Sequence, residues 1–277
     1  NNGNNAQTND IENLKVGYEY TYEWTGANKS GLTGGDNPTP LPKPCTKPDK
    51  PSIELSTNSI CKEDKDNTSV TITVIGEAEK EKVVKRNGAK PYDLLCVTGD
   101  LGAAYAGLLV LQREKAAFMV NPNSQPQLKD YEYEVGRQLK PEAKKKIIDF
   151  FEQEGILPTS MIDISDGLAS EALHICTQSD VGCEIYLEKL PIDYRVSRTF
   201  EEFKILADTG ALNGGEDYEL LFTINQKDYE KIQKNDDIHV IGHITDKSLG
   251  CQLVTPQNTT IELKAQGWNH YKNKEEN

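Results

Sequence analysis

Two aspartates with a hydroxyl between them form the clearest chemical pattern in this sequence. Asp163 and Asp166 lie in the run MIDISDGL, and Ser165 stands between them. The apolar residues before the first aspartate predict a strand, and the helical spacing after Gly167 predicts a helix, so both acids would lie on the joining turn. Such a turn suits Mg²⁺, which prefers oxygen ligands and is usually held by one or two carboxylates together with substrate phosphates. Capping of the following helix by Ser165 or Asp166 is the alternative, and it would explain one acid but not both.

A second acidic turn precedes an apolar strand further along the chain. In LNGGEDYELLFTI, Gly214 and Gly215 come directly before Glu216 and Asp217. Paired glycines let the backbone approach a ligand closely, and acids that enter an apolar strand are costly unless they are exposed at its end or paired. The residues alone support a binding site and a structural turn equally well.

Three further side chains could contact a phosphate or a ring. Arg86, in KRNGAKPYD, could hold a phosphate through two hydrogen bonds, although a surface arginine in a turn is more often only solvated. Asp36 follows two glycines and could belong to a metal or phosphate turn, although a solvated turn is more common. Trp268 could stack on a flat heteroaromatic ring or anchor the C-terminal segment to the core. The four histidines show no paired-ligand spacing, which argues against a zinc site.

The composition limits the classes of partner. The 277 residues carry a formal net charge of -13, which argues against a nucleic acid or an anionic membrane as the main partner. No apolar run is long enough to span a bilayer. None of the six cysteines forms a CxxC pair; they are Cys45, Cys61, Cys96, Cys176, Cys183 and Cys251. This cysteine pattern is typical of a reduced cytoplasmic protein.

The chain changes in character near residue 69. An Asn-rich start and six prolines between Pro38 and Pro51 predict a disordered or irregular leader over residues 1–69. Beyond it, apolar strands alternate with helices, which indicates an α/β or α+β fold. Residues 119–140 show no steady period and predict a connection that crosses between domains. We expect strands at 70–78, 94–97, 184–187, 218–224 and 239–244, a hairpin at 252–263, and helices at 101–113, 141–155, 168–176, 200–207 and 226–234.

Several motifs occur in the order typical of one family. They are VIGEAEKEKVVKRNGAKPYDLLCVTGDLGAAYAGL, MIDISDGLASEALHI, LNGGEDYELLFTI, VIGHIT and GWNHY. Residues 70–271, which contain them, resemble thiamine-monophosphate kinase, of the superfamily shared with aminoimidazole-ribonucleotide synthetase. The resemblance implies a PurM-like C-terminal domain at residues 121–277 and a remnant of an N-terminal ATP-binding domain at residues 70–120.

The resemblance also implies an activity and its site. The family uses ATP and Mg²⁺ to phosphorylate thiamine monophosphate to thiamine diphosphate. Because phosphoryl transfer needs charge neutralisation and alignment more than covalent help, no residue is assigned as an acid or base. The family forms a homodimer. The implied roles are Mg²⁺ ligation by Asp163 and Asp166, ATP contact by Ser165 and Arg86, substrate contact by Glu216, Asp217 and Trp268, and a further Mg²⁺ contact by Asp36.

The N-terminal half of the family is largely missing or replaced in this sequence. In the family, a GDDAA-type loop, a TTD segment and a GGDTT turn supply most of the Mg²⁺ ligands. The first two do not occur here, and Gly34, Gly35 and Asp36 resemble the third but lie too far upstream of Arg86. We therefore expect impaired turnover, and the homodimer, which the family builds through N-terminal sheets, is placed in doubt. Two alternatives stay open: another ATP-using member of the same superfamily, and a non-catalytic remnant that binds substrate only.

Overall fold

The chain forms two compact units, Asn1–Val83 and Val84–Asn277, which are described separately. The structure is a computed structural model and describes residues 52–55, 72–75, 79–123 and 125–266. In the first unit, β1 (Ser52–Leu55) pairs antiparallel with β2 (Ile72–Ile75). β2 confirms a strand within residues 70–78. Apart from β1, the leader expected at residues 1–69 lies outside the described residues, as do Asp36 and Trp268.

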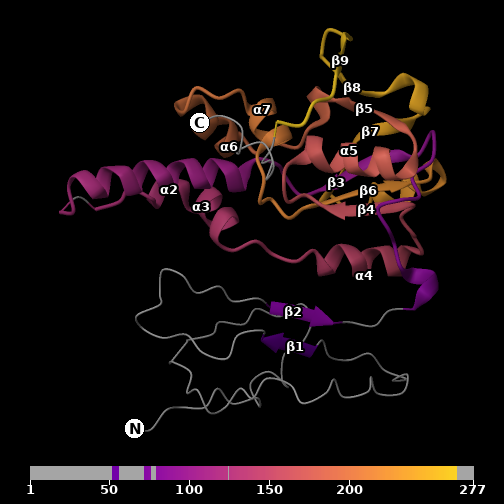
Figure 1. The fold of residues 1–277 in the computed structure, drawn as a ribbon, viewed down its shortest axis with the longest axis horizontal. Coiled ribbons are helices and arrows are strands. Elements are labelled where there is room, and N and C mark those ends of the chain that lie inside the picture. Colours follow the sequence, from indigo (N-terminus) through magenta and orange to yellow (C-terminus); the bar gives the residue numbers. More distant parts are fainter. Residues whose placement is uncertain (1–51, 56–71, 76–78, 124, 267–277) are drawn as a thin grey trace, which may run out of the picture. The chain divides into compact units, whose positions relative to one another are not determined.

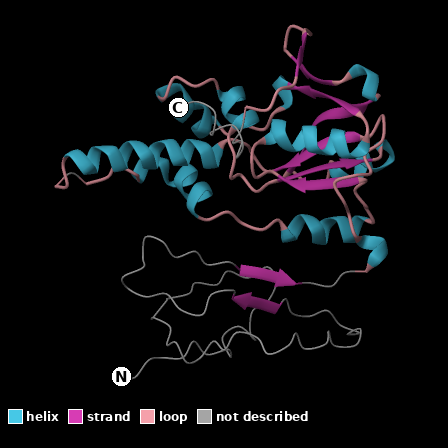
Figure 2. Ribbon diagram, viewed as in Figure 1, coloured by secondary structure: helices cyan, strands magenta, loops and turns pink. Residues whose placement is uncertain are grey.

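A seven-stranded sheet forms the centre of the second unit (Figures 1 and 2), in the order β4-β6-β3-β7-β5-β8-β9. The neighbours pair antiparallel except β5 and β8, which are parallel. β3 lies inside the sheet. The domain boundaries expected at residues 69 and 120 stay predictions. The strands are β3 (Leu94–Thr98), β4 (Ser160–Asp163), β5 (Gly182–Tyr186), β6 (Leu220–Ile224), β7 (Ile238–Thr245), β8 (Cys251–Val254) and β9 (Thr260–Glu262).

The helices of the second unit are mostly short. None of the helices within the described residues is long and apolar enough to cross a membrane. Short 3₁₀ turns occur at Lys129–Tyr131, Leu187–Lys189, Gln226–Asp228 and Lys247–Leu249, and a further one, Lys80–Lys82, belongs to the first unit. The α-helices are α2 (Ala103–Val120), α3 (Glu132–Leu139), α4 (Lys145–Glu154), α5 (Leu168–Ser179), α6 (Tyr194–Glu202), α7 (Ala207–Asn213) and α8 (Tyr229–Ile232).

Successive side chains of the sheet enter two different cores. Val97 of β3 belongs to the core that contains Leu168 of α5. Its neighbour Cys96 points to the opposite face, as expected for a strand, and belongs to a core with Phe151 of α4 and Phe222 of β6. These two phenylalanine rings meet edge to face, with centroids 5.0 Å apart. Helices therefore cover both faces of the sheet, α5 on one and α4 on the other (Figure 1).

Two helical regions differ from the sequence expectations. Residues 119–140, for which no helix was predicted, contain α3. Its apolar pattern is weak because Glu134 lies on its buried side, where Thr199 Oγ1 donates a hydrogen bond to Glu134 Oε1 at 2.9 Å. The helix expected at 200–207 is in fact the end of α6 and the start of α7. The side chain of Asp193 accepts a hydrogen bond from Arg195 N at 2.8 Å and caps α6 several residues earlier than expected.

Candidate active site

The acidic turn lies between β4 and α5, as the sequence predicted. β4 ends at Asp163, and α5 begins at Leu168 after Gly167, which has φ 119°. A Cβ on this glycine would lie 2.9 Å from a backbone oxygen of α7, so the turn requires glycine there. Gly167 is the N-cap of α5 and no side chain caps the helix, so the alternative role of Ser165 or Asp166 as the cap is wrong. Both aspartates are exposed.

The GGED turn packs directly against the acidic turn through its backbone. Glu216 N donates a hydrogen bond to the Ser165 carbonyl oxygen at 2.8 Å, and Tyr218 N donates to the Ile164 carbonyl oxygen at 2.8 Å. A Cβ on Gly215 would lie 2.5 Å from the same Ser165 oxygen, so this close approach also depends on glycine. The structure thus brings exposed Glu216 beside the turn that carries the predicted metal ligands.

The exposed carboxylates of Asp163, Asp166 and Glu216 are called the acidic cluster below. They act together on the phenol of Tyr218, whose hydroxyl donates a hydrogen bond to Glu216 Oε2 at 3.1 Å. Burial, this hydrogen bond and the negative charges of all three carboxylates raise the pKa of the Tyr218 phenol. The phenol therefore stays neutral near pH 7, and the surface attracts cations.

The acidic cluster does not by itself enclose an ion. Within the described residues, three ligand atoms lie within 4.8 Å of one another only in a group of cysteines. Mg²⁺ is usually held by only one or two carboxylates and completes its shell with water and phosphate oxygens, so Asp163 and Asp166 stay candidate ligands for it. Residues of the acidic cluster line neither of two hollows of 570 and 330 Å³. A phosphate ligand therefore needs contacts from residues beyond these two turns.

Glu171 is a buried acid behind the acidic turn that the sequence reasoning missed. Its Oε1 accepts hydrogen bonds from Asp166 N at 3.1 Å and from Ser165 Oγ at 3.5 Å. Its Oε2 is buried and has no hydrogen-bond partner among the described residues. Burial, together with the charges of Asp166 and Asp163, raises the pKa of Glu171. The available signal was its spacing from Leu168, which places it on the apolar face of α5.

Asp217, predicted as a substrate contact, is buried instead and holds the start of α2. Its carboxylate accepts hydrogen bonds from Gly102 N at 2.7 Å and from Ala104 N at 3.2 Å. Burial raises the pKa of Asp217 to about 7, although both hydrogen bonds act in the opposite direction. Of the two acids in the GGED turn, Glu216 faces solvent and Asp217 supports the fold.

Glu219, two residues further on, is fully buried among cations. Its Oε1 lies 2.8 Å from Arg137 Nη2 and 2.7 Å from Lys144 Nζ, at angles outside hydrogen-bond geometry. Its Oε2 accepts a hydrogen bond from Thr98 Oγ1 at 2.5 Å. These contacts hold the start of β6 to β3, α3 and the N-terminus of α4. They therefore fix the strand whose preceding turn carries Glu216.

Arg86, predicted to contact ATP, lies at the opposite end of α5 from the acidic turn. Its carbonyl oxygen accepts a hydrogen bond from Ser179 Oγ at 3.5 Å, and its side chain is exposed. The preceding residue, Lys85, accepts a hydrogen bond from Met161 N at 3.0 Å, so the backbone next to Arg86 lies beside β4, two residues before Asp163. Ser165 is half-buried and lies in the acidic turn itself. The ATP contacts of Arg86 and Ser165 stay predictions.

The fold places this chain in the PurM-like class. The solved structure of hydrogenase maturation protein HypE in complex with ATP matches 70% of this chain and 56% of that protein, with a TM-score of 0.53 at 15% identity. At this identity the match shows the fold alone. No family model matches the chain.

Other known proteins are more similar to this chain in sequence. Thiamine-monophosphate kinase of Buchnera aphidicola subsp. Schizaphis graminum is 35% identical over 212 residues, which are 73% of this chain and 60% of the relative. The enzyme of Bacillus subtilis is 32% identical over 215 residues, 75% of this chain and 61% of the relative. The structure of AaThiL complexed with AMPPCP and TMP has a TM-score of 0.58 at 29% identity and covers 73% of this chain and 58% of that protein.

These matches confirm the resemblance predicted from the motifs: this chain is a relative of thiamine-monophosphate kinase. The chain spans about three fifths of the length of the curated relatives it matches.

Proposed function

We propose that this chain takes part in the ATP- and Mg²⁺-dependent phosphorylation of thiamine monophosphate to thiamine diphosphate. The observation that carries the proposal is the backbone hydrogen bonding of the GGED turn to the acidic turn, which gathers Asp163, Asp166 and Glu216 on one surface. The relatives named as thiamine-monophosphate kinases and the solved complex with AMPPCP and TMP support the choice of substrates.

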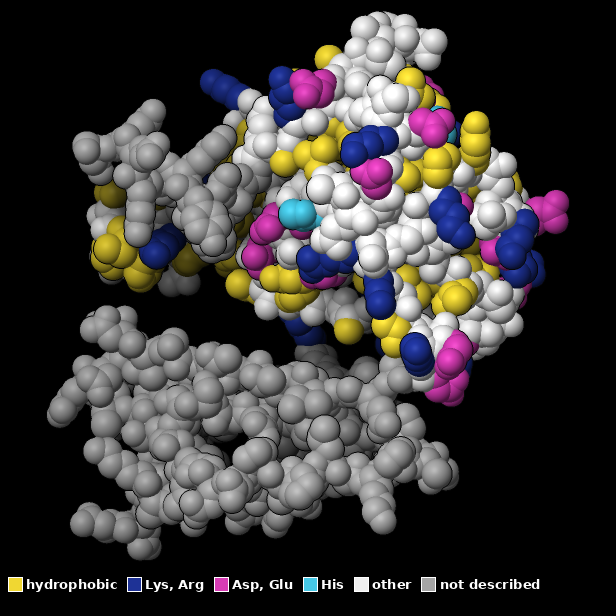
Figure 3. All heavy atoms as spheres, turned by 45° about the vertical axis from the view of Figure 1, so that its right-hand side comes forward, with side chains coloured by type: hydrophobic (Ala, Val, Ile, Leu, Met, Phe, Trp, Pro, Cys, Tyr) yellow, Lys and Arg dark blue, Asp and Glu magenta, His cyan; other side chains and the backbone are white. Residues whose placement is uncertain are grey.

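The reaction joins two anions, and this sets what the protein must supply. A phosphate oxygen of thiamine monophosphate attacks the γ-phosphorus of ATP, the bond from that phosphorus to the β–γ bridging oxygen breaks, and ADP leaves. Bound Mg²⁺ would offset the phosphate charge, and Asp163 and Asp166 would hold it. The Lys and Arg side chains on the face in Figure 3 lie among Asp and Glu side chains, so that face offers no broad basic patch for phosphates.

The other roles in this proposal rest on the same two turns. Glu216 contacts the substrate from the rim of the acidic cluster, and Ser165 contacts ATP from within the turn. Arg86, Trp268 and Asp36 keep their predicted roles as ATP, substrate and further Mg²⁺ contacts. Because the described residues supply only part of a Mg²⁺–ATP site, we expect a lower turnover than that of a full-length relative. The cytoplasmic location and the homodimer also stay predictions.

Thiamine diphosphate formation by the purified chain tests the proposal. Turnover with ATP, Mg²⁺ and thiamine monophosphate should be measurable and should fall at least about 100-fold in Asp166→Asn, since the charge that holds the metal is lost. Asp180→Asn is the matched control: Asp180 lies exposed at the other end of α5, with φ 57°, a conformation that asparagine accepts. Equal turnover in both variants would contradict the assigned site.

Calorimetric titration separates an enzyme from a remnant that binds substrate only. The proposal requires binding of ATP with Mg²⁺ and of thiamine monophosphate. Binding of thiamine monophosphate without any binding of ATP would overturn the kinase assignment in favour of the remnant. A preference for a different phosphate acceptor would favour another ATP-using member of the superfamily.

A further inference from the structure

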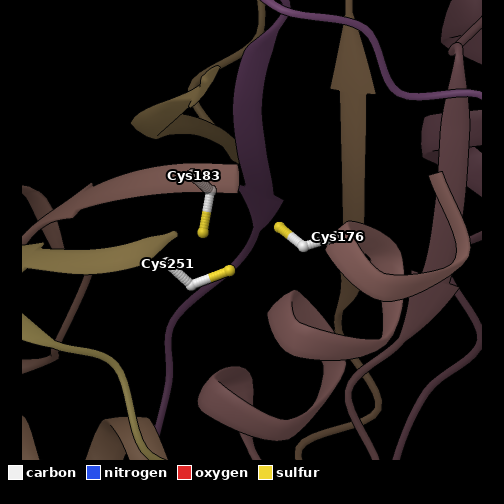
Figure 4. Close-up of side chains that lie close together, drawn as sticks. All are labelled: Cys176, Cys183 and Cys251. Atoms are coloured by element: carbon white, nitrogen blue, oxygen red, sulfur yellow. The ribbon is translucent and has the colours of Figure 1, made fainter. Parts of the chain in front are cut away.

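Three cysteines that are far apart in the sequence meet at one point of the second unit. Cys176 lies near the end of α5, Cys183 in β5 and Cys251 at the start of β8. Their sulfur atoms all lie within 4.8 Å of one another, and all three thiols are free. Figure 4 shows the side chains directed toward a common space between the helix and the two strands. They are called the cysteine trio below.

Rigid elements hold the cysteine trio in place. Cys183 and Cys251 are direct partners in the parallel pairing of β5 and β8, and Cys183 N also donates a hydrogen bond to the Gly250 carbonyl oxygen at 3.1 Å. Val181 N donates to the Cys176 carbonyl oxygen at 3.0 Å, so the end of α5 leads directly into β5. The three sulfurs are thus positioned by a helix end and a strand pair, and no loop has to fold to bring them together.

The surroundings of the cysteine trio are apolar, with access from one side. Cys176 is 3% exposed and Cys183 is 0% exposed, and both belong to the core cluster that covers the α5 face of the sheet. Cys251 packs against this core and remains partly exposed. A small ion can therefore reach the sulfurs past Cys251 while the other two are shielded from water and from larger oxidants.

We propose that Cys176, Cys183 and Cys251 form a three-thiolate binding site for a soft metal ion, of which Cu(I) is the best fit. Thiolates are soft ligands and select Cu(I) over hard cations. Structural zinc sites are almost always four-coordinate, whereas this cluster offers three ligand atoms within the described residues.

The site is independent of the proposed kinase site. The acidic turn precedes the N-terminus of α5 and Cys176 lies near its C-terminus, so the length of the helix separates oxygen ligands from sulfur ligands. Removal of the Asp166 carboxylate should leave Cu(I) binding unchanged, and failure of either proposal can be recognised without the other.

Anaerobic titration of the reduced full chain with Cu(I), in competition with a chromophoric Cu(I) chelator, tests the site. The chain used carries Cys45→Ala, Cys61→Ala and Cys96→Ala, because two of these cysteines lie outside the described residues and the third is buried in β3. One equivalent of Cu(I) should bind, with three sulfur neighbours in X-ray absorption. In Cys251→Ser the affinity should fall at least about 100-fold, since a direct ligand matters at least as much as the groups that orient it.

The background without Cys45, Cys61 and Cys96 is the matched control, and it should bind Cu(I) like the unaltered chain. Cys251 is partly exposed, so its serine variant should keep the near-ultraviolet circular dichroism of the parent; Cys176→Ser provides a second ligand removal if it does not. The proposal would be overturned if the chain did not bind Cu(I), or if X-ray absorption showed only two sulfur neighbours of the metal. Unchanged Cu(I) affinity in both serine variants would overturn it as well.

Discussion

The run GGEDYE places acids of the same kind in two opposite environments. Glu216 is exposed and joins the acidic cluster, whereas Asp217 is 3% exposed and Glu219 is 0% exposed. The exposed acid has no cation beside it in the described contacts and can offer its charge to a ligand. The buried acids already have their partners, backbone amides for one and cations for the other. Burial therefore separates acids that can bind a ligand from acids that hold the fold.

The largest effect on stability is expected at Glu219. Glu219→Ala removes the partner of two partly buried cations, and breaking such a pair should lower the free energy of unfolding by about 3–5 kcal/mol. Urea denaturation measures it. Glu154→Ala is the control, because Glu154 pairs with exposed Lys234 at 2.7 Å on the surface, and its loss should cost less than about 1 kcal/mol. Equal losses in the two variants would show that Glu219 is not the buried anchor described above.

The second largest effect on stability is expected at Glu171, because its carboxylate holds the acidic turn to α5. Glu171→Ala leaves the partly buried Asp166 amide without its acceptor, and the loss of this hydrogen bond should cost about 1–3 kcal/mol. Glu171→Gln keeps an acceptor oxygen there and should cost less. Thermal unfolding of the two variants compares them. A glutamine variant as unstable as the alanine variant would mean that the charge, and not the hydrogen bond, holds the turn.

Asp217 should give a smaller and pH-dependent effect. Asp217→Ala removes the acceptor for Gly102 N and Ala104 N, and loss of such a cap should cost about 1–2 kcal/mol. Because burial raises the pKa of Asp217 from 3.8 to about 7, its protonated form is the favoured one in the folded state. The stability it contributes is complete below pH 3.8 and is lost as the pH rises through about 7.

The difference in unfolding free energy between the native chain and Asp217→Asn isolates this titration. Asparagine retains an acceptor oxygen but does not ionise. The free energy of unfolding of the native chain, relative to that of the variant, should therefore be higher at pH 5 than at pH 8. Urea denaturation at both pH values measures this difference. A difference that does not change between the two pH values would show that Asp217 ionises normally.

Local sequence patterns predicted the elements that carry the acidic cluster. Apolar runs located β3, β4, β6 and β7, and the glycines before Glu216 and after Asp166 marked the two turns. The sequence did not show which of Glu216 and Asp217 is exposed and which is buried. This depends on where α2 begins, more than 100 residues away in the chain. Helix α3 was missed because its inward residue Glu134 is charged.

The cysteine trio could not be predicted from local patterns at all. Cys183 meets Cys251 only through the parallel pairing of β5 with β8, and no spacing rule along the chain sets that register. The burial of Glu171 was within reach, since its spacing from Leu168 places it on the apolar face of α5. Local sequence patterns therefore did not predict the features that depend on long-range strand pairing or on the position of a distant helix start.

The smallest effect on stability, and the most direct test of the central claim, is expected at Asp166. This side chain is exposed, so Asp166→Asn should change the free energy of unfolding by less than about 0.5 kcal/mol. In calorimetric titration with ATP, the native chain and Asp180→Asn should bind more tightly when Mg²⁺ is present, and Asp166→Asn should lose that enhancement. Mg²⁺-dependent ATP binding that persists unchanged in Asp166→Asn would contradict the account.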